Sequence, residues 1–340
     1  MGLRILVTGG AGYIGSHTMI PLLAAGHDVC VIDNYCNSSP QTLEKVRQIS
    51  NRTFEVENLD IRNRPKMVEV VHRFRPNTVI HFAAVKSVPA GQMRPVDYFD
   101  VNVSGTISML HALEGIDCQH VVFSSSAAVY GELQTAPVSE AHVPQPSNVY
   151  GRSKRMAEQV IEDWVKSTAN GVSATLLRYF NPVGAHPSGL ISDASCTEPA
   201  NLVPIIMQVA KGKRAAFDLY GNDYATPDGS CIRDFIHIED LADAHIAAVD
   251  YAPRQTSVVK VFNLGNGHGT SVSEVIKTFE NVAKVPIPVT IAPRRQGDVA
   301  VVYASCEKAK QELGWQPKRT LEEMLNSSWH AYQRCIEIGK

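Results

Sequence analysis

The 340-residue sequence has little of what marks an exported, membrane-spanning or nucleic-acid-binding protein. Its seven cysteines are scattered and include no C-x-x-C pair, so neither a disulfide framework nor a zinc site is indicated. No apolar run approaches the roughly 20 residues of a membrane-spanning helix, and the first residues lack a signal-peptide pattern. The formal net charge of −2 does not favour a nucleic-acid or membrane partner. These absences predict a cytoplasmic protein with free thiols and no metal site.

Short apolar or β-branched runs alternate with helical patterns up to about residue 181. The expected strands are 4–8, 28–32, 53–57, 78–82, 120–124 and 173–178. The expected helices are 14–25, 40–49, 65–74, 97–114 and 149–168. This alternation predicts βαβ units and a parallel sheet covered by helices on both faces.

The pattern changes after residue 181, where proline, glycine and serine become frequent. Short strands then mix with helices expected at 200–212, 238–251, 271–284, 306–313 and 320–334. We therefore predict an α/β fold: a Rossmann-like, doubly wound parallel sheet with a smaller mixed α/β C-terminal lobe.

A glycine-rich turn, Gly-Gly-Ala-Gly-Tyr-Ile-Gly at residues 9–15, directly follows the first expected strand. Its glycines permit a tight turn close to a pyrophosphate, and the next helix presents its N-terminus to negative charge. Asp33 ends the second strand, where a carboxylate accepts hydrogen bonds from ribose hydroxyls and repels a 2′-phosphate. A turn aspartate without a ligand is the alternative. The pattern predicts an NAD-binding domain over 1–181, joined by segments near 235–265, and a mainly substrate-binding lobe over 182–340.

Tyr150 and Lys154 form a Y-x-x-x-K pair, which places both side chains on one helical face. A phenol has a pKa near 10, and a nearby cation favours the phenolate, so Tyr150 is a candidate general base. Tyr130 has Gln134 four residues later and lacks such a cation. A surface tyrosine beside a solvated lysine is the bland alternative. A serine at the end of the fifth strand would complete the site.

These residues together resemble the extended short-chain dehydrogenase/reductase superfamily, and within it the UDP-glucose 4-epimerase family. The resemblance runs from about residue 3 to about residue 330 and is carried by several stretches. They are VTGGAGYIGSH, DIRN, VIHFAA, SSSAAVYG, YGRSK, LRYFNPVGAHPSG, IRDFIH and APRRQGD.

The resemblance implies that tightly bound NAD takes hydride from C4 of a UDP-sugar and returns it to the opposite face. Tyr150 would be the base, Lys154 would tune it, and Ser126 would assist at O4; Ser125 would be structural. The implied cofactor residues are Gly9, Gly12, Tyr13, Ile14, Gly15, Asp33, Asn34, Asn37, Ser38, Asp60, Ile61, Phe82, Ala83, Ala84, Lys86, Asn102, Ser124, Tyr150, Lys154 and Phe180. The implied substrate residues are Lys86, Ser126, Tyr150, Asn181, Asn201, Leu202, Asp218, Tyr220, Arg233, Arg295, Asp298 and Val302.

The sequence departs from the family pattern at several loop positions, including Val149, Ala84 and Pro89. One departure concerns specificity. Some epimerases carry a tyrosine against the sugar's 2-position, four residues beyond the equivalent of Asp298; here Val302 stands there, followed by Tyr303. A smaller side chain should admit N-acetylated sugars, unless a shift of one residue brings Tyr303 to the sugar.

Several alternatives share the glycine turn and the Tyr–Lys pair. A nucleotide-sugar 4,6-dehydratase or a UDP-glucuronate decarboxylase needs an acid beside the fifth-strand serine, where this chain has Ala127 and Ala128. A simple alcohol dehydrogenase would not explain the basic sites expected for a UDP-sugar. A non-catalytic NAD-binding regulator needs no Tyr–Lys pair. The family resemblance also implies a homodimer formed through helices 97–114 and 149–168.

Overall fold

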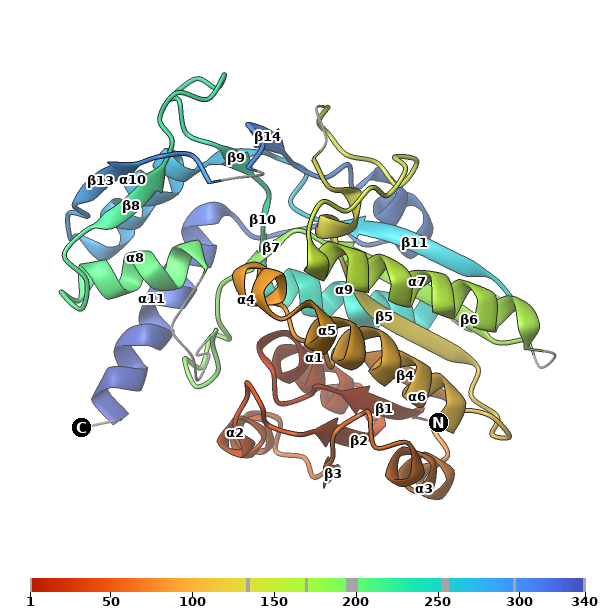
Figure 1. Cartoon of the computed structure of the whole chain (residues 1–340). Coiled ribbons are helices and arrows are strands. Elements are labelled where there is room, and N and C mark those ends of the chain that lie inside the picture. The colour runs from red at the N-terminus through yellow and green to blue at the C-terminus, as the bar shows by residue number, and fades with distance from the viewer. Residues whose placement is uncertain are drawn as a thin grey trace.

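The fold is described from a computed structural model covering residues 2–132, 135–168, 171–193, 201–251, 257–295 and 298–338. Its centre is a seven-stranded parallel sheet with the order β11-β6-β5-β4-β1-β2-β3 (Figure 1). The strands are β1 (Arg4–Thr8), β2 (Asp28–Asp33), β3 (Glu55–Asn58), β4 (Thr78–His81), β5 (His120–Ser126), β6 (Ser173–Tyr179) and β11 (Val259–Leu264). This topology confirms the predicted doubly wound α/β fold.

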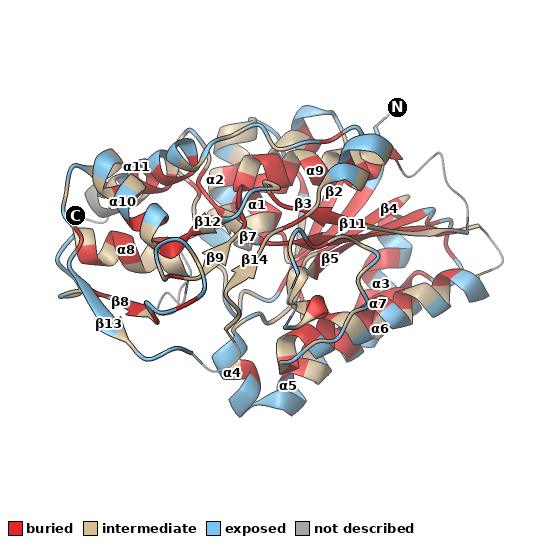
Figure 2. Cartoon of the chain, turned by 90° about the horizontal axis from the view of Figure 1, so that it is seen from above, coloured by how far each residue is buried: buried red, intermediate tan, exposed pale blue. Residues whose placement is uncertain are grey.

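Helices cover both faces of the sheet because successive strand side chains point to opposite sides. In β1, Ile5 and Val7 join a core with one helix set, whereas Leu6 joins the core on the other face. Figure 2 shows the two layers and the buried residues between them. The first set is α1 (Tyr13–Ala24), α2 (Pro40–Ser50) and α9 (Ile238–Tyr251); the second is α3 (Arg64–Phe74), α6 (Gly105–Ala112) and α7 (Val149–Ser167).

The helix expected at 97–114 is present but contains a π-helical turn: α5 (Pro95–Phe99) runs into a wide turn over Asp100–Ser104, which continues into α6. A separate short helix, α4 (Val88–Met93), precedes it. Proline fits the first turn of a helix but breaks a helix interior, so Pro95 begins a new segment. The wide turn carries Asn102, whose side-chain amide bonds both backbone groups of Val85 and the hydroxyl of Ser153. Such π-turns are frequent at functional sites.

The C-terminal lobe is built from small sheets and three helices around its own apolar core. The pairs are β7 (Asn181–Val183) with β10 (Phe235–His237), β8 (Phe217–Tyr220) with β13 (Val289–Ala292), and β9 (Ile232–Arg233) with both β12 (Thr270–Ser271) and β14 (Val301–Val302). The helices are α8 (Leu202–Ala210), α10 (Val272–Ala283) and α11 (Leu321–Ile338). Residue 200, the first of the helix expected at 200–212, lies outside the described residues. The ring of Phe279 packs edge-on against Trp329 in this core, at 5.4 Å between centroids.

The chain returns to the large sheet after entering this lobe. β10 leads directly into α9, which packs on α1, and β11 then pairs with β6 at the edge of the sheet. The expected helix at 306–313 is a π-helical turn over Ala309–Leu313. Within the described residues, no helix is both long and apolar enough to cross a membrane.

Candidate active site

The candidate residues gather where the parallel strands end. The sheet's strands all point the same way, so their carboxyl ends lie at one edge. From β1 the chain continues to β2 on one side, whereas β4 lies on the other side, and ligands of doubly wound sheets bind at such a reversal. This places the turn after β1, the loop after β4 and the serines of β5 at neighbouring positions.

The glycine turn is packed too closely for larger residues. Gly9 has a φ of +74°, and a Cβ atom there would lie 2.7 Å from the amide nitrogen of Ala83. A Cβ at Gly15 would lie 2.4 Å from the carbonyl oxygen of Gly9. Gly12 is the N-cap residue of α1 and has no side chain with which to cap the first amide groups of the helix. Tyr13 and Ile14 begin the first turn. A phosphate group fits such a helix start.

Asp33 connects this turn to the loop that follows β2. Its carboxylate is 7% exposed and accepts hydrogen bonds from Ala11 N, Tyr35 N and Ser38 Oγ, each at 2.9 Å. A carboxylate has about four acceptor positions, so one further donor such as a ribose hydroxyl can be accommodated. Asn37 lies exposed in the same loop. These features fit an adenosine ribose.

The next pair along this edge is Asp60 and Ile61. Asp60 accepts a hydrogen bond from Asn34 at 2.9 Å and pairs with Arg62 at 2.7 Å. The hydrogen bonds from Arg62 lower the pKa of Asp60 to about 2. Ile61 is buried against Gly105, where a Cβ atom would lie 2.4 Å from its side chain. Asp60 is thus held by Asn34 and Arg62, and Ile61 is held by its packing against Gly105.

Tyr150 and Lys154 lie on the first turns of α7, after the N-cap Asn148. Lys154 is 2% exposed, and its ammonium donates to the carbonyl oxygen of Ser124 at 2.7 Å. Burial lowers the pKa of Lys154 to about 7, although Glu158 acts in the opposite direction. Burial also raises the pKa of Tyr150 to about 12, and a hydrogen bond with Ser126 partly offsets this. The sequence predicts that Lys154 lowers the pKa of Tyr150. The protein's own groups raise the pKa of Tyr150 instead, because burial is the largest effect.

The three serines of β5 have three different surroundings. The Ser124 hydroxyl pairs with the hydroxyl of Tyr179, whose pKa is raised by burial, so that this phenol stays protonated. Ser125 donates to Glu158 at 2.5 Å and is fully buried. Ser126 faces Tyr150 and accepts the amide N–H of Ala128 at 3.2 Å. Of the three serines, Ser126 is therefore the one whose side chain lowers the pKa of the candidate base.

Sequence reasoning missed two residues behind these serines. Glu158 is completely buried and pairs with Arg178 through two contacts of 2.7 and 2.8 Å. It follows Lys154 by four residues, so the helical spacing could have revealed it. Tyr179 carries no comparable signal, because its contact with Ser124 joins two different strands.

Tyr130 lies away from this chemistry. It is 2% exposed, and its hydroxyl donates to the side chain of Asn263 at 2.7 Å. The guanidinium of Arg178 lies 4.9 Å from the centre of its ring. This surrounding gives Tyr130 a role in the core.

The loop after β4 follows the strand that neighbours β5 on the side away from β6. Phe82 packs against His245 at 4.8 Å between ring centroids, and Ala83 donates to the carbonyl of Thr8 at 3.1 Å. Ala84 is half-buried, and Lys86 is exposed just beyond the segment that Asn102 holds.

The remaining predicted residues, which are the cofactor residue Phe180 and the other substrate residues, form three groups. Phe180 is buried after β6, and the exposed Asn181 follows it, donating to the carbonyl of Asp234 at 2.8 Å. Asn201 and Leu202 begin α8, where Asn201 bonds Asp193 at 2.9 Å. The third group comes from the small sheets and the chain between β13 and β14. Asp218, Tyr220, Arg233 and Val302 lie in strands, and Arg295 and Asp298 lie between β13 and β14.

Within the third group three contacts are defined. Arg233 pairs with Asp298 at 3.1 Å, and Val302 lies opposite Arg233 in the ladder of β14 and β9. The guanidinium of Arg295 lies 3.8 Å from the centre of the Tyr220 ring, which shares a strand face with Asp218. Leu202 of α8 packs on the same apolar core as Phe217 and Leu219 of β8, the strand that also carries Asp218 and Tyr220. Among the described residues, no cluster of metal-ligating side chains is found.

Comparison with known proteins gives matches along nearly the whole chain. The family model described as GDP-mannose 4,6 dehydratase matches residues 6–328. UDP-glucose 4-epimerase 4 of Oryza sativa subsp. japonica is 44% identical over 96% of this chain and 89% of that protein. The structure of UDP-glucose-4-epimerase from Stenotrophomonas maltophila, with bound NAD and formylated UDP-arabinopyranose, is 41% identical with a TM-score of 0.95. It covers 99% of this chain and 100% of that one.

A further solved structure bears on specificity. The UDP-Glc/GlcNAc 4-epimerase of Campylobacter jejuni is 36% identical with a TM-score of 0.86, and the match covers 98% of this chain and 100% of that one. The family model alone carries a dehydratase name, whereas these full-length relatives are epimerases. Because the Oryza and Stenotrophomonas relatives exceed 40% identity over nearly all of its length, the chain belongs to the UDP-glucose 4-epimerase family of the extended short-chain dehydrogenases/reductases.

Proposed function

We propose that this chain catalyses the NAD-dependent C4 epimerisation of UDP-hexoses, interconverting UDP-glucose and UDP-galactose through a transient 4-keto sugar. The observation that carries this proposal is the placement of Tyr150 beside Ser126 and the buried Lys154, at the strand ends that also hold the glycine turn. Proton transfer at a sugar hydroxyl requires a positioned base of this kind. The relatives reported above carry the name UDP-glucose 4-epimerase, which supports the same reaction for this chain.

NAD would lie along the carboxyl edge of the sheet, with its pyrophosphate at the start of α1 and its adenosine ribose at Asp33. The close-packed glycines and the remaining acceptor position on Asp33 support this placement. When bound, NAD supplies the hydride acceptor and donor for C4. The whole set of cofactor residues predicted from the sequence is proposed with it, including Asn102, Ser124 and Phe180.

Tyr150 would exchange a proton with O4 of the sugar while Ser126 holds the same oxygen. Burial makes a phenolate at Tyr150 a strong base, and any positive charge that arrives beside it makes ionisation easier. Lys154 is held within this site by Ser124 and contributes an ammonium group when protonated. The proton that Tyr150 takes from one sugar hydroxyl is returned after the sugar has turned.

The residues after Ser126 support epimerisation rather than elimination. Ala127 and Ala128 form the start of a short 3₁₀ turn over Ala127–Tyr130 and carry no group that transfers a proton. A 4,6-dehydratase requires such a group near C5 and C6, so the keto sugar would be reduced again instead. A 4,6-dehydratase and a non-catalytic NAD-binding regulator remain the alternative functions.

The UDP part of the substrate would bind in the C-terminal lobe, outside the proposed cofactor domain of residues 1–181 and the returning segments near 235–265. Arg233 and Arg295 each offer a planar guanidinium, which suits the oxygens of a diphosphate. Asn181 is exposed and would contact the same diphosphate. In the sequence it lies between the serines of β5 and the two arginines. Asn201, Leu202, Asp218, Tyr220 and Asp298 would hold the nucleoside.

We also propose activity on UDP-N-acetylglucosamine and UDP-N-acetylgalactosamine. Val302 packs against the apolar cluster that contains Phe180, as Ala127 does, whereas Tyr303 lies against Gly269, where a Cβ atom would be 3.0 Å from its ring. This arrangement supports Val302, rather than Tyr303, as the residue beside the sugar. The Campylobacter relative named for both sugar types supports this breadth.

Turnover of four UDP-sugars, measured together with the NAD retained by the protein, tests these proposals. Conversion of UDP-galactose without added NAD and without released NADH is expected. Formation of a dehydrated sugar would favour the dehydratase, and no turnover at all would favour the regulator. Val302→Tyr should selectively reduce kcat/KM for the N-acetylated pair, whereas Val302→Cys, similar in size, should not.

We further propose a cytoplasmic homodimer. Met93 and Val96 are each 76% exposed and Met156 is 44% exposed, on α4, α5 and α7. Exposed apolar residues gathered on adjacent helices are typical of protein interfaces. Light scattering at several concentrations tests this assembly, and Val96→Asp should shift it towards a monomer.

A further inference from the structure

The segment 184–186, which follows β7, is held by hydrogen bonds from two helices that are far apart in the sequence. Each of its three successive backbone N–H groups donates to a side chain. The pairs are Gly184 N to Ser328 Oγ at 3.0 Å, Ala185 N to Ser327 Oγ at 3.2 Å, and His186 N to His17 Nε2 at 3.1 Å. The three side chains thus satisfy three successive backbone donors of a segment that has no regular secondary structure.

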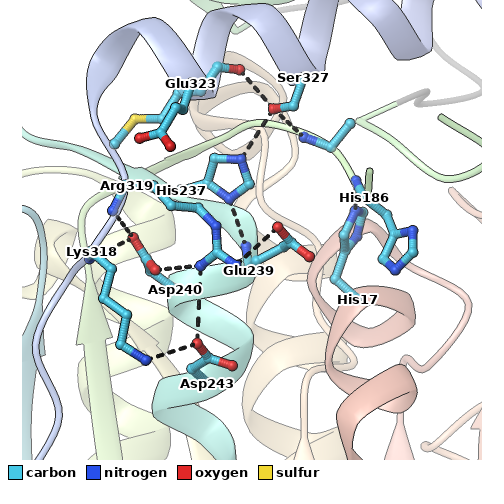
Figure 3. A network of polar contacts seen from close by, with 12 residues as sticks. His17, His186, His237, Glu239, Asp240, Asp243, Lys318, Arg319, Glu323 and Ser327 are labelled. Carbon is cyan, nitrogen blue, oxygen red and sulfur yellow. Dashed lines mark hydrogen bonds and ion pairs between the residues drawn. The ribbon is translucent and has the colours of Figure 1, made fainter. Parts of the chain in front are cut away.

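Helix α1 holds one side of this segment. The hydroxyl of Tyr13 donates to the carbonyl of Gly184 at 2.6 Å, and His17 Nδ1 lies 2.7 Å from the carbonyl of Tyr13. Figure 3 shows His17 and His186 next to each other, as their hydrogen bond requires. The amide of His186 also lies 3.4 Å from the carbonyl of Ile191. Both contacts of α1 start within its first two turns, directly after the glycine turn.

Helix α11 holds the other side directly, through Ser327 and Ser328. His237, the last residue of β10, packs beside it and contacts both α11 and α9. Its Nε2 lies 3.0 Å from Ser327 Oγ, and its Nδ1 accepts the amide N–H of Glu239 at 3.0 Å (Figure 3). Gly184 has a φ of +108°, and a Cβ atom there would lie 2.7 Å from the His237 ring. The ring therefore packs directly on the backbone of Gly184.

Both histidines must be neutral to make these contacts, because a protonated imidazole cannot accept a hydrogen bond. His17 accepts at Nε2, so its proton is on Nδ1 and points to Tyr13. Burial lowers the pKa of His17 to about 3, with His186 and His237 adding to the effect. Burial and Arg319 lower the pKa of His237 to about 4. Both side chains thus keep one acceptor at neutral pH.

We propose that His17 is a positioning residue for the diphosphate of the UDP-sugar, acting through the segment 184–186. This inference rests on the proposed function, in which Asn181 contacts the diphosphate and Phe180 borders the reacting end of the cofactor. β7 joins Asn181 to Gly184 within three residues. His17 therefore fixes the distance between the helix that starts at the cofactor pyrophosphate and the strand that carries Asn181.

The test compares three variants of the full-length protein with its bound NAD. His17→Leu removes the nearer of the two acceptors of the His186 amide. It is expected to raise the Kd for UDP about tenfold, measured by calorimetry, and the KM for UDP-galactose equally. The kcat and the NAD content should change less than about twofold, because the Tyr150 site is untouched. His17→Gln can still accept the His186 amide and should restore most of the affinity.

His27→Leu is the matched control. His27 also accepts a distant backbone amide, that of Leu3 at 3.1 Å, but at the far end of α1. It should lower the unfolding temperature by a similar amount without changing the Kd for UDP. Equal changes of Kd in both variants, an unchanged Kd in His17→Leu, or no rescue by His17→Gln would overturn the proposal.

Two further outcomes separate this inference from the proposed function. Should His17→Leu not fold, Ser327→Ala opens the other side of the segment and should raise the same Kd about threefold; no change would then overturn the proposal. Wild-type protein that binds UDP but does not convert UDP-galactose refutes the epimerase function, while the Kd values still decide the role of His17. Wild-type protein that does not bind UDP overturns both.

Discussion

Acid should destabilise this protein well above the pH at which carboxylates protonate. Five histidines are at most 2% exposed, and burial lowers the pKa of each to about 3 or 4. They are His17, His81, His120, His237 and His245. In the unfolded chain each regains a pKa near 6.5, so unfolding takes up protons below that pH. Their contribution is complete above pH 6.5 and is lost as the pH falls towards the folded values.

The size of the effect follows from the pKa differences. Each histidine loses about 1.4 kcal/mol per pH unit below 6.5, so moving from pH 7 to pH 5 costs about 2 kcal/mol per histidine and about 10 kcal/mol for all five. Asp234 acts in the opposite direction, because burial raises its pKa to about 6, and it returns about 1 kcal/mol over the same interval. A net loss of about 9 kcal/mol is comparable to the whole stability of an ordinary domain. We therefore expect acid unfolding near pH 5.

His245 offers a variant that isolates one of these contributions. Its Nδ1 lies 2.8 Å from the carbonyl of Leu241, but its Nε2 is buried without a hydrogen-bond partner. His245→Leu removes this unpaired atom together with the titration. Its stability at pH 7 should stay within about 1 kcal/mol of the wild type, and its loss between pH 7 and pH 5 should be smaller by about 2 kcal/mol.

Urea denaturation followed by circular dichroism at pH 7, 6 and 5, with saturating NAD throughout, measures these changes. His72→Leu, at an exposed position, is the control and should follow the wild-type dependence. A wild-type stability that is flat from pH 7 to pH 5 would refute the reasoning. So would a His245→Leu curve parallel to that of the wild type.

Three other changes have defined expectations. Tyr150→Phe should lower kcat at least about 100-fold in a coupled UDP-galactose assay while the retained NAD stays constant, and a smaller loss would argue against its role as the base. Arg178→Met leaves the carboxylate of Glu158 buried without its main partner and should cost about 3–5 kcal/mol in chemical denaturation. Arg73→Met breaks only exposed pairs and should cost less than about 1 kcal/mol; equal costs would contradict this account. Asp33→Asn should shift binding from NAD towards NADP in a competition experiment, since it removes the charge that repels a 2′-phosphate; an unchanged preference would show that Asp33 does not set it.

Local patterns were sufficient for the large sheet and for the start of the site. The strand runs and the glycines after β1 are features of neighbouring residues, and the Tyr150–Lys154 spacing lies within one helix. The π-helical turn within the helix expected at 97–114 was not predicted. This wide turn depends on Asn102 reaching Val85 and Ser153, which are distant in the sequence.

The missed parts of the site all depend on contacts between distant segments. Tyr179 meets Ser124 only because β5 and β6 are neighbours in the sheet, and His17 meets His186 across 169 residues. Hydrophobic periodicity reports which face of an element is buried but not which element covers it. The pKa of Tyr150 was misjudged for the same reason, since the burial that raises it comes from several elements.

The place of β11 limits how this chain can be divided and when it can fold. β6 is finished at Tyr179, but its partner at the sheet edge ends only at Leu264. At a synthesis rate of roughly 5–20 residues per second, those 85 residues take roughly 4–17 seconds, during which one edge of β6 is without its strand. An excised fragment ending at residue 181 would keep that edge permanently open to other chains. The large sheet therefore cannot be completed by a fragment that ends before β11. Any chimaera must transfer residues 259–264 together with the first six strands.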